Sequence, residues 1–237
     1  MQRLDCILVY YRFLFHCLSK ASQKGGCAML MFLVRHGESE PNITTRDWDL
    51  SLRGEHQARL TGHHLAQAGI THLVSSPLRR ALSTAHIMAE ILDYRPIDVW
   101  LDLREGCDDA YCGPSQEEFR ARYPRAAVPE HMPVEGWTYL GDRYASFRER
   151  CEYLHATLKT QFSTDDRVVV VAHGGVLSYL LNTIVGVPVE APLWFEMENC
   201  AISRVRFVSA QDQTAWPLYP VMTIEILSLN EVAHLHG

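Results

Sequence analysis

Two histidine-glycine pairs stand directly after short apolar runs, although they lie far apart in the chain. Residues 29–34 lead into Arg35-His36-Gly37, and residues 167–172 lead into His173-Gly174-Gly175. Short, continuous apolar runs are typical of strands that are buried on both faces of a parallel sheet. Ligands in open α/β sheets bind beyond the carboxyl ends of such strands. We therefore expect both histidines to face one crevice.

Arginines are placed to reach the same crevice. Arg35 directly precedes His36, and the sequence Ser75-Ser76-Pro77-Leu78-Arg79-Arg80 follows a further predicted strand. A guanidinium presents its donors in a rigid fork that suits phosphate oxygens better than the ammonium of lysine does. Two imidazoles beside guanidiniums therefore indicate a ligand that carries a phosphate group.

The rest of the chain alternates short apolar runs with amphipathic stretches. Strands are predicted at residues 29–34, 73–75, 97–101 and 167–172, with two more within 201–229 around a turn at 212–217. Helices are predicted at residues 52–68, 78–92, 116–123, 140–158 and 174–185, the third of them beginning at a capping box from Ser115 to Glu118. This alternation predicts an α/β fold, a three-layer α/β/α sandwich with a mostly parallel central sheet.

The domain organisation is predicted to be simple. We find no repeat and no interdomain linker, so residues 29–237 form one domain, in which the proline-containing segment 124–139 is irregular. Residues 1–28 differ, because their apolar run is interrupted by Arg12 and His16. That run is too short and too polar to span a membrane, which takes about 20 mostly apolar residues. We interpret residues 1–28 as an N-terminal extension, either a mis-assigned start of translation or a weak peripheral anchor.

The overall composition narrows the classes of partner. Apolar residues make up 47% and charged residues 21% of the chain, which argues against disorder. The net charge of −6 disfavours nucleic-acid binding, because that needs basic surfaces. Seven scattered cysteines fit reduced thiols in a cytoplasmic protein better than a disulfide framework. The predicted partner is a small phosphorylated substrate, with no nucleic acid and no stable membrane association.

No metal site or cofactor site is predicted. The pair His63-His64 and the tail residues His234 and His236 lack carboxylate or cysteine partners at ligand spacing. We therefore expect these four histidines to be exposed helix and tail residues.

Five blocks, in this order, resemble the histidine phosphatase (phosphoglycerate mutase-like) superfamily. They are Arg35-His36-Gly37-Glu38-Ser39 with Asn42, the run from Leu50 to Ala58, the run from Ser75 to Ala81 with Thr84-Ala85, Leu103-Arg104-Glu105, and the run from Val170 to Gly175. The match covers residues 31–207. A lone Arg-His-Gly triplet would be weak evidence, whereas five ordered blocks are specific. The resemblance implies a phosphoglycerate mutase-like α/β/α fold.

The resemblance also implies a role for each matching residue. His36 would be the nucleophile that attacks phosphorus to give a phosphohistidine, and Glu105 would protonate the leaving oxygen and later accept a proton from water. The phosphoryl group would be held by Arg35, Arg80 and His173, with Asn42 assisting and Gly174 among the substrate-binding residues. The motif assigns Arg80 to the pocket and leaves Arg79 as a solvated helix charge.

These residue types suit phosphoryl transfer without a metal ion. The reaction is catalysed mainly by positioning and by neutralising charge on the phosphoryl oxygens. An imidazole attacks only when it is neutral, and its unperturbed pKa is about 6.5. Neighbouring cations should disfavour protonation of His36.

Three functional alternatives remain open at this point. Mutases of the superfamily carry a long insertion between the acid and the second histidine, and the modest interval from Glu105 to His173 therefore favours hydrolysis over phosphoglycerate mutase activity. The sequence departs from the family after Glu105, where it reads Gly106-Cys-Asp-Asp-Ala-Tyr-Cys-Gly113. Asp108 or Asp109 could therefore replace Glu105 as the acid. The same departure from the family leaves the third functional alternative open, a non-catalytic scaffold that binds phosphorylated ligands.

Overall fold

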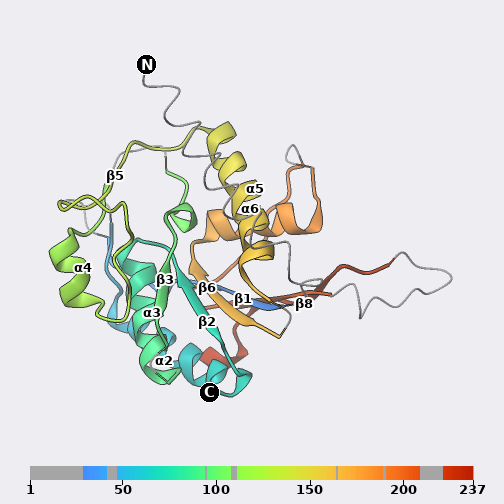
Figure 1. The fold of residues 1–237 in the computed structure, drawn as a ribbon. Helices are drawn as coiled ribbons and strands as arrows, with labels where there is room; N and C mark the ends of the chain where they lie inside the picture. Colours follow the sequence, from blue (N-terminus) through green and yellow to red (C-terminus); the bar gives the residue numbers. More distant parts are fainter. Residues whose placement is uncertain are drawn as a thin grey trace.

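The computed structural model describes residues 29–41, 47–93, 95–107, 111–163, 165–188, 191–208 and 221–236. The expectations for residues 1–28 and for the turn at 212–217 lie outside these ranges. A six-stranded sheet forms the centre of the molecule (Figure 1). In spatial order its strands are β3 (Ile97–Val99), β2 (His72–Ser75), β6 (Arg167–Ala172), β1 (Leu30–Arg35), β7 (Ile202–Phe207) and β8 (Ile224–Glu231). The first four run parallel, whereas β7 and β8 join by antiparallel pairing, so the sheet is mostly parallel as predicted.

Helices cover both faces of this sheet. One face carries α2 (Leu52–Leu65), α3 (Arg79–Ile91) and α4 (Gln116–Arg122), and the other carries α5 (Tyr144–Gln161) and α6 (Gly174–Val185) (Figure 1). Successive residues of a strand point to opposite faces, so a strand between two helix layers is apolar throughout. In β1, Met31 and Leu33 enter the core beneath α5 and α6, and Phe32 and Val34 enter the other core. The predicted three-layer α/β/α sandwich is therefore confirmed.

The strand register decides which side chains meet at the carboxyl edge of the sheet. In the parallel pair of β1 and β6, Arg35 lies opposite Ala172, so His36 and His173 are the next residues of their strands. The amide of His36 donates to the carbonyl of Ala172 at 2.9 Å. On the other side of β6, the amide of Ser76 donates to the carbonyl of Val171. Residues 36, 173 and 76 thus leave the sheet side by side.

Several element boundaries differ from the prediction for local reasons. The strand at 97–101 ends at Val99, because residues Leu101–Leu103 form a 3-10 helix. The helix at 140–158 begins only at Tyr144, and Leu140, which is 84% exposed, is not part of its apolar stripe. The segment predicted to be irregular contains β5 (Thr138–Tyr139), which pairs with β4 (Tyr111–Cys112).

The C-terminal end differs from the predicted exposed tail. Nε2 of His234 lies 3.0 Å from Oγ1 of Thr61 in α2, and its ring stacks on that of His64 with centroids 4.9 Å apart. Burial is the main reason that the pKa of His234 is lowered. The expectation of an exposed His234 is therefore wrong, whereas His63, His64 and His236 are exposed as expected.

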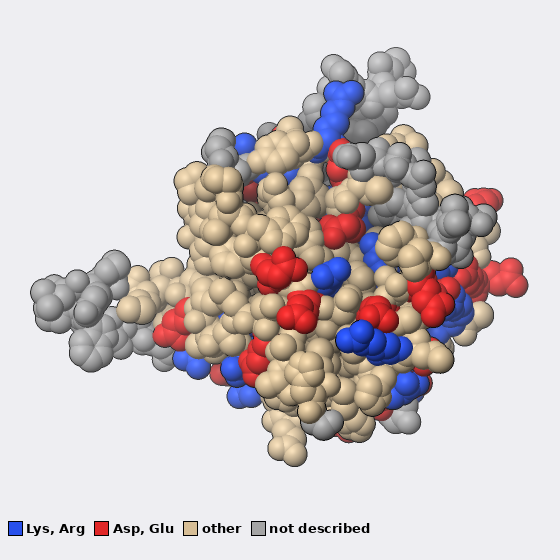
Figure 2. All heavy atoms as spheres, turned by 180° about the vertical axis from the view of Figure 1, so that it is seen from behind, with Lys and Arg blue, Asp and Glu red and all other residues tan. Residues whose placement is uncertain are grey.

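The surface is mixed in charge on the face seen in Figure 2. Acidic and basic side chains are interspersed there and separated by uncharged residues. None of the described helices combines the length and apolar character that crossing a membrane requires.

Candidate active site

His36 is held in one neutral tautomer by two contacts. Its Nδ1 lies 2.7 Å from the carbonyl oxygen of Gly37, which can only accept, so Nδ1 carries the hydrogen. The Nε of Arg80 can only donate, and it lies 3.2 Å from Nε2 of His36. Nε2 therefore carries a lone pair, which is the requirement for an attacking nitrogen.

The surroundings of His36 disfavour its protonated form. Burial, followed by the positive charge of Arg80, lowers the pKa of His36 to about 3, although the hydrogen bond to Gly37 acts in the opposite sense. The direction agrees with the sequence prediction, but burial rather than neighbouring charge is the larger cause. The ring is thus neutral throughout the physiological pH range.

His173 lies next to His36 and is fully buried. The ring centroids are 5.0 Å apart, and burial followed by the charge of Arg80 lowers the pKa of His173 well below its ordinary value. Nε2 of His173 lies 2.7 Å from Oγ of Ser76, and that oxygen also accepts the amide of Leu78 at 3.3 Å. Nδ1 of His173 has no hydrogen-bond partner among the described residues. Ser76 therefore orients the ring through one nitrogen, while the buried Nδ1 keeps an unused hydrogen-bonding capacity.

Arg35 ends β1, and its guanidinium lies beside Gly174, the first residue of α6. One of its terminal nitrogens, Nη1, donates to the carbonyl of Met197 at 2.7 Å, while the buried Nε has no partner among the described residues. A Cβ on Gly174 would lie 3.7 Å from that Nε, so Gly174 is where the helix passes the guanidinium. The structure thus places Arg35, Arg80 and both histidines in one cluster.

Asp47, a buried residue that the sequence analysis did not identify, contacts both Arg79 and Arg80. Arg79 contacts Asp47 at 3.1 Å and Glu118 at 2.6 Å, and its side chain is only 12% exposed. The expectation that Arg79 is a solvated charge is therefore wrong, since two carboxylates hold it at the base of α3. Arg80 lies 3.8 Å from Asp47 and extends to His36 instead. Burial raises the pKa of Asp47 to about 6 despite both guanidiniums.

Glu105 is anchored to the first turn of α6. Its two oxygens accept the amides of Gly175 and Val176 at 3.0 Å each, and one also accepts the amide of Gly106 at 2.9 Å. A helix N-terminus favours a carboxylate because its first amides lack partners within the helix. A Cβ on Gly175 would lie 2.5 Å from a Glu105 oxygen, so only glycine admits this contact. The acid is thereby placed on the same helix turn that follows His173.

Arg150 of α5 holds the chain segment that leads to Glu105. Its Nη1 donates to the carbonyls of Asp102 and Arg104 at 2.7 and 2.6 Å, and its Nη2 contacts Asp142 at 2.7 Å. The side chains of this ion pair are almost fully buried. The carbonyls of Asp102 and Arg104 lie 48 and 46 positions before Arg150 in the sequence, and no local pattern signals these contacts.

Two further polar residues support the His36 turn. Oγ1 of Thr84 in α3 accepts the amide of Gly37 at 3.0 Å, and Nδ2 of Asn199 donates to the carbonyl of His36 at 3.0 Å. Ser76 and Thr84 both lie in the matching sequence blocks, which is the signal that could have identified them. Asn42, Asp108 and Asp109 lie outside the described residues.

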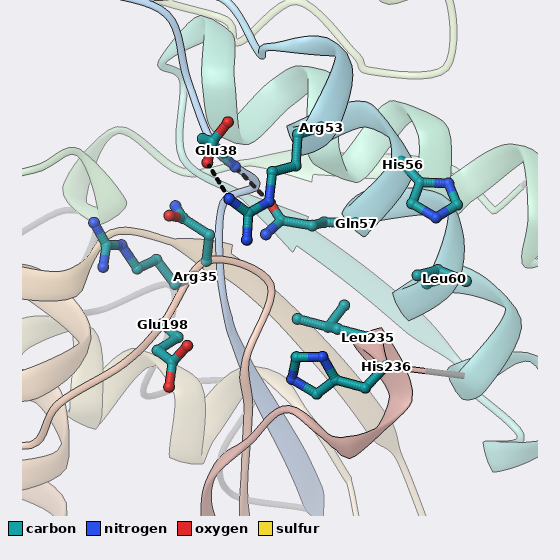
Figure 3. A pocket seen from close by; sticks show the side chains of 10 residues that line it. Arg35, Glu38, Arg53, His56, Gln57, Leu60, Glu198, Leu235 and His236 are labelled. Carbon is teal, nitrogen blue, oxygen red and sulfur yellow. Dashed lines mark hydrogen bonds and ion pairs between the residues drawn. The ribbon is translucent and has the colours of Figure 1, made fainter.

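Hollows flank Arg35 on both sides. One, of about 370 Å³, lies towards α2 and is lined by Glu38, Arg53, His56, Glu198 and other residues shown in Figure 3. In it Arg53 contacts Glu38 at 3.3 Å, and Gln57 accepts the amide of Glu38 (Figure 3). The other, of about 540 Å³, lies towards α5 and α6 and includes Glu105. Among the described residues, no group of three histidine, cysteine or acidic side chains could hold a metal ion.

Comparison with known proteins decides the family. A family model described as the histidine phosphatase superfamily (branch 1) matches residues 31–216. The chain belongs to this superfamily. A protein named probable phosphoglycerate mutase GpmB from Serratia proteamaculans is 33% identical over 187 residues, which are 74% of this chain and 83% of that protein. The protein of the same name from Photorhabdus laumondii is 31% identical over 189 residues, covering 75% and 84%.

Solved structures of two phosphatases share the fold. A mycobacterial glucosyl-3-phosphoglycerate phosphatase superposes with a TM-score of 0.59 at 22% identity, over 86% of this chain and 100% of that one. A phosphoserine phosphatase from Entamoeba histolytica, in complex with 3-phosphoglyceric acid, gives a TM-score of 0.59 at 20% identity, over 87% and 99%. The predicted phosphoglycerate mutase-like fold is thereby confirmed.

The burial of His36 predicts that its ring stays neutral as the pH falls from 7 to 4. In nitrogen-detected NMR, the His36 ring, assigned by comparison with a His36→Gln variant, should keep one neutral tautomer over this range. The same chain unfolded in urea is the control, since its histidines should titrate near the ordinary pKa of about 6.5. Because the unfolded chain then binds the proton that the folded chain excludes, this histidine makes the free energy of unfolding decrease as the pH falls below about 6.5. Protonation of folded His36 near pH 6.5 would contradict the assignment.

The buried contacts of Arg150 predict a large stability loss for Arg150→Met. This change removes the donor of two carbonyls and of Oδ2 of Asp142, while Oδ1 of Asp142 keeps its contact with Arg104 at 3.2 Å. We expect a loss of about 3 kcal/mol of the free energy of unfolding. Arg148→Met on the same helix is the control, because its pair with Glu152 is exposed and worth at most about 1 kcal/mol. Denaturant unfolding measures the free energy of unfolding of both variants. Equal losses would show that the buried contacts of Arg150 contribute no more to stability than the exposed pair of Arg148.

Proposed function

We propose that this superfamily member is a metal-independent phosphomonoester hydrolase that acts on a small phosphorylated metabolite through a phosphohistidine at His36. One observation carries the proposal. The lone pair on Nε2 of a buried, neutral His36 lies beside Arg80 and next to His173. A nucleophile surrounded by donors suits attack on a phosphoryl group, whose oxygens need charge stabilisation.

In the first step, Nε2 of His36 forms a bond to phosphorus as the bond from phosphorus to the alcohol oxygen breaks. Arg80 exchanges its contact with His36 for a phosphoryl oxygen, and Arg35 and His173 hold the others. The alcohol oxygen takes the breaking electron pair and a proton from Glu105. The products are free alcohol and phosphohistidine.

In the second step, Glu105 takes a proton from a water molecule as the water oxygen attacks phosphorus. The bond from phosphorus to Nε2 breaks, and its electron pair returns to His36. One water is consumed and inorganic phosphate is released. Glu105 therefore acts as a general acid in the first step and as a general base in the second.

A phosphoglycerate mutase is the second candidate function. It is favoured by the relatives named probable phosphoglycerate mutase, whereas similar solved structures carry the names of phosphatases. The interval between Glu105 and His173 is modest in length, which supports hydrolysis because nothing long is available there to keep water from a phosphoenzyme.

The two candidates predict different products. Incubation with a panel of small phosphomonoesters should release inorganic phosphate, and a His36→Ala variant should lose this activity by at least about a thousandfold. The rate should be unchanged by EDTA. The matched assay follows conversion of 3-phosphoglycerate to 2-phosphoglycerate, and conversion faster than phosphate release would establish the mutase instead. An unchanged rate in His36→Ala would refute the phosphohistidine.

The role of Glu105 predicts a dependence on the leaving group. Glu105→Gln cannot donate a proton, so hydrolysis of alkyl phosphates should slow by about 100-fold or more. Hydrolysis of p-nitrophenyl phosphate should slow far less, because nitrophenolate leaves without a proton. Glu149→Gln, on the exposed surface of α5, serves as the control. Equal losses on both substrates would assign the acid to another residue.

A further inference from the structure

The larger hollow beside Arg35 has an unusual lining for a site that would receive an anion. Phe147 and Tyr179 from α5 and α6 lie on one side with Trp194, and Glu105 and Glu196 contribute two carboxylates. We infer that the alcohol part of the substrate is an aromatic group without a negative charge, and that it binds in this hollow. The inference rests on the proposed function and names its substrate class.

The position of Glu105 decides which hollow receives the alcohol. In the proposed reaction the alcohol oxygen must face Glu105, since that residue protonates it. Glu105 and Arg35 both line the larger hollow, so an alcohol that extends from the phosphoryl group past Glu105 enters this space. The smaller hollow lies on the other side of Arg35, is not lined by Glu105, and has its Arg53 paired with Glu38 (Figure 3).

Aromatic rings form a wall suited to another ring. The Tyr179 ring meets that of Phe147 edge to face, with centroids 5.1 Å apart and planes at 75°, and it meets that of Trp194 at 6.4 Å and 82°. Rings at right angles leave faces and edges free for a further ring in the same arrangement. Trp194 is 53% exposed, so much of its surface is available for a ligand to cover.

The charges of the hollow oppose an anionic alcohol. Arg35 is the only cation among its described lining residues, and it already donates to the carbonyl of Met197 and faces the phosphoryl site. A carboxylate on the alcohol, as in a phosphoglycerate, would lie near Glu105 and Glu196 without a second cation. Like charges brought together in this hollow disfavour such a ligand.

The test compares four primary alkyl phosphates that differ only beyond the reacting oxygen. These are ethyl phosphate, 2-phenylethyl phosphate, choline phosphate and the phosphate ester of 3-hydroxypropanoate. We expect kcat/KM for the phenylethyl ester to exceed that for ethyl phosphate by at least about tenfold, and the carboxylate ester to fall below ethyl phosphate by a similar factor. A higher kcat/KM for the carboxylate ester or the choline ester than for the phenylethyl ester overturns the inference.

Two pairs of variants connect the preference to this hollow. Trp194→Ala should lower the ratio of phenylethyl to ethyl activity by about tenfold, whereas the adjacent exposed Leu193→Ala should leave this ratio unchanged. Glu196→Gln should raise the activity on the carboxylate ester relative to ethyl phosphate, and Glu198→Gln, in the smaller hollow, should not. Equal effects within either pair overturn the inference.

The failure of the inference can be distinguished from failure of the proposed function. A protein that hydrolyses ethyl phosphate and p-nitrophenyl phosphate without preferring the phenylethyl ester is a phosphatase with a different substrate class. A protein that hydrolyses none of these esters refutes the hydrolase itself.

Discussion

The parallel pairing of β1 with β6 is the constraint on which the rest of the site depends. Because Arg35 lies opposite Ala172, the next residues of the two strands, His36 and His173, leave the sheet side by side. Their rings meet at 5.0 Å although 136 residues separate them in the chain. A shift of one residue in this register would turn one imidazole to the opposite face of the sheet.

Burial at this edge has a chemical consequence as well as a structural one. Removing the two imidazoles from water lowers the pKa of both, so the attacking nitrogen keeps its lone pair beside two guanidiniums. Asp47 lies 3.1 Å from Arg79 and 3.8 Å from Arg80, and its carboxylate offsets part of the positive charge at this edge. The same low-dielectric surroundings strengthen the interactions that a phosphoryl group would make there.

The N-terminus of α6 joins this cluster to the cavity beside it. Glycine at 175 lets Glu105 approach the first turn, and the amides of that turn fix the carboxylate. Arg150 fixes the chain that carries Glu105 from the other side. Tyr179 lies on the same helix one turn further along and faces the cavity. The helix α6 therefore contacts both the proposed acid and the hollow in which we propose that the substrate alcohol binds.

The amino-acid sequence by itself determined the two His-Gly turns and the order of the central strands and the helices that cover them, but not the short β4–β5 pair. The central elements follow from local patterns, such as a strand that is apolar on both faces. The sequence also determined the family, since five ordered blocks are specific. Only the tertiary structure decided that Arg79 is bound between Asp47 and Glu118, that Ser76 orients His173, and that Arg150 supports Glu105. Each of these contacts joins residues distant in the chain, and a charge or hydroxyl carries no local signal of the partner that folding brings to it.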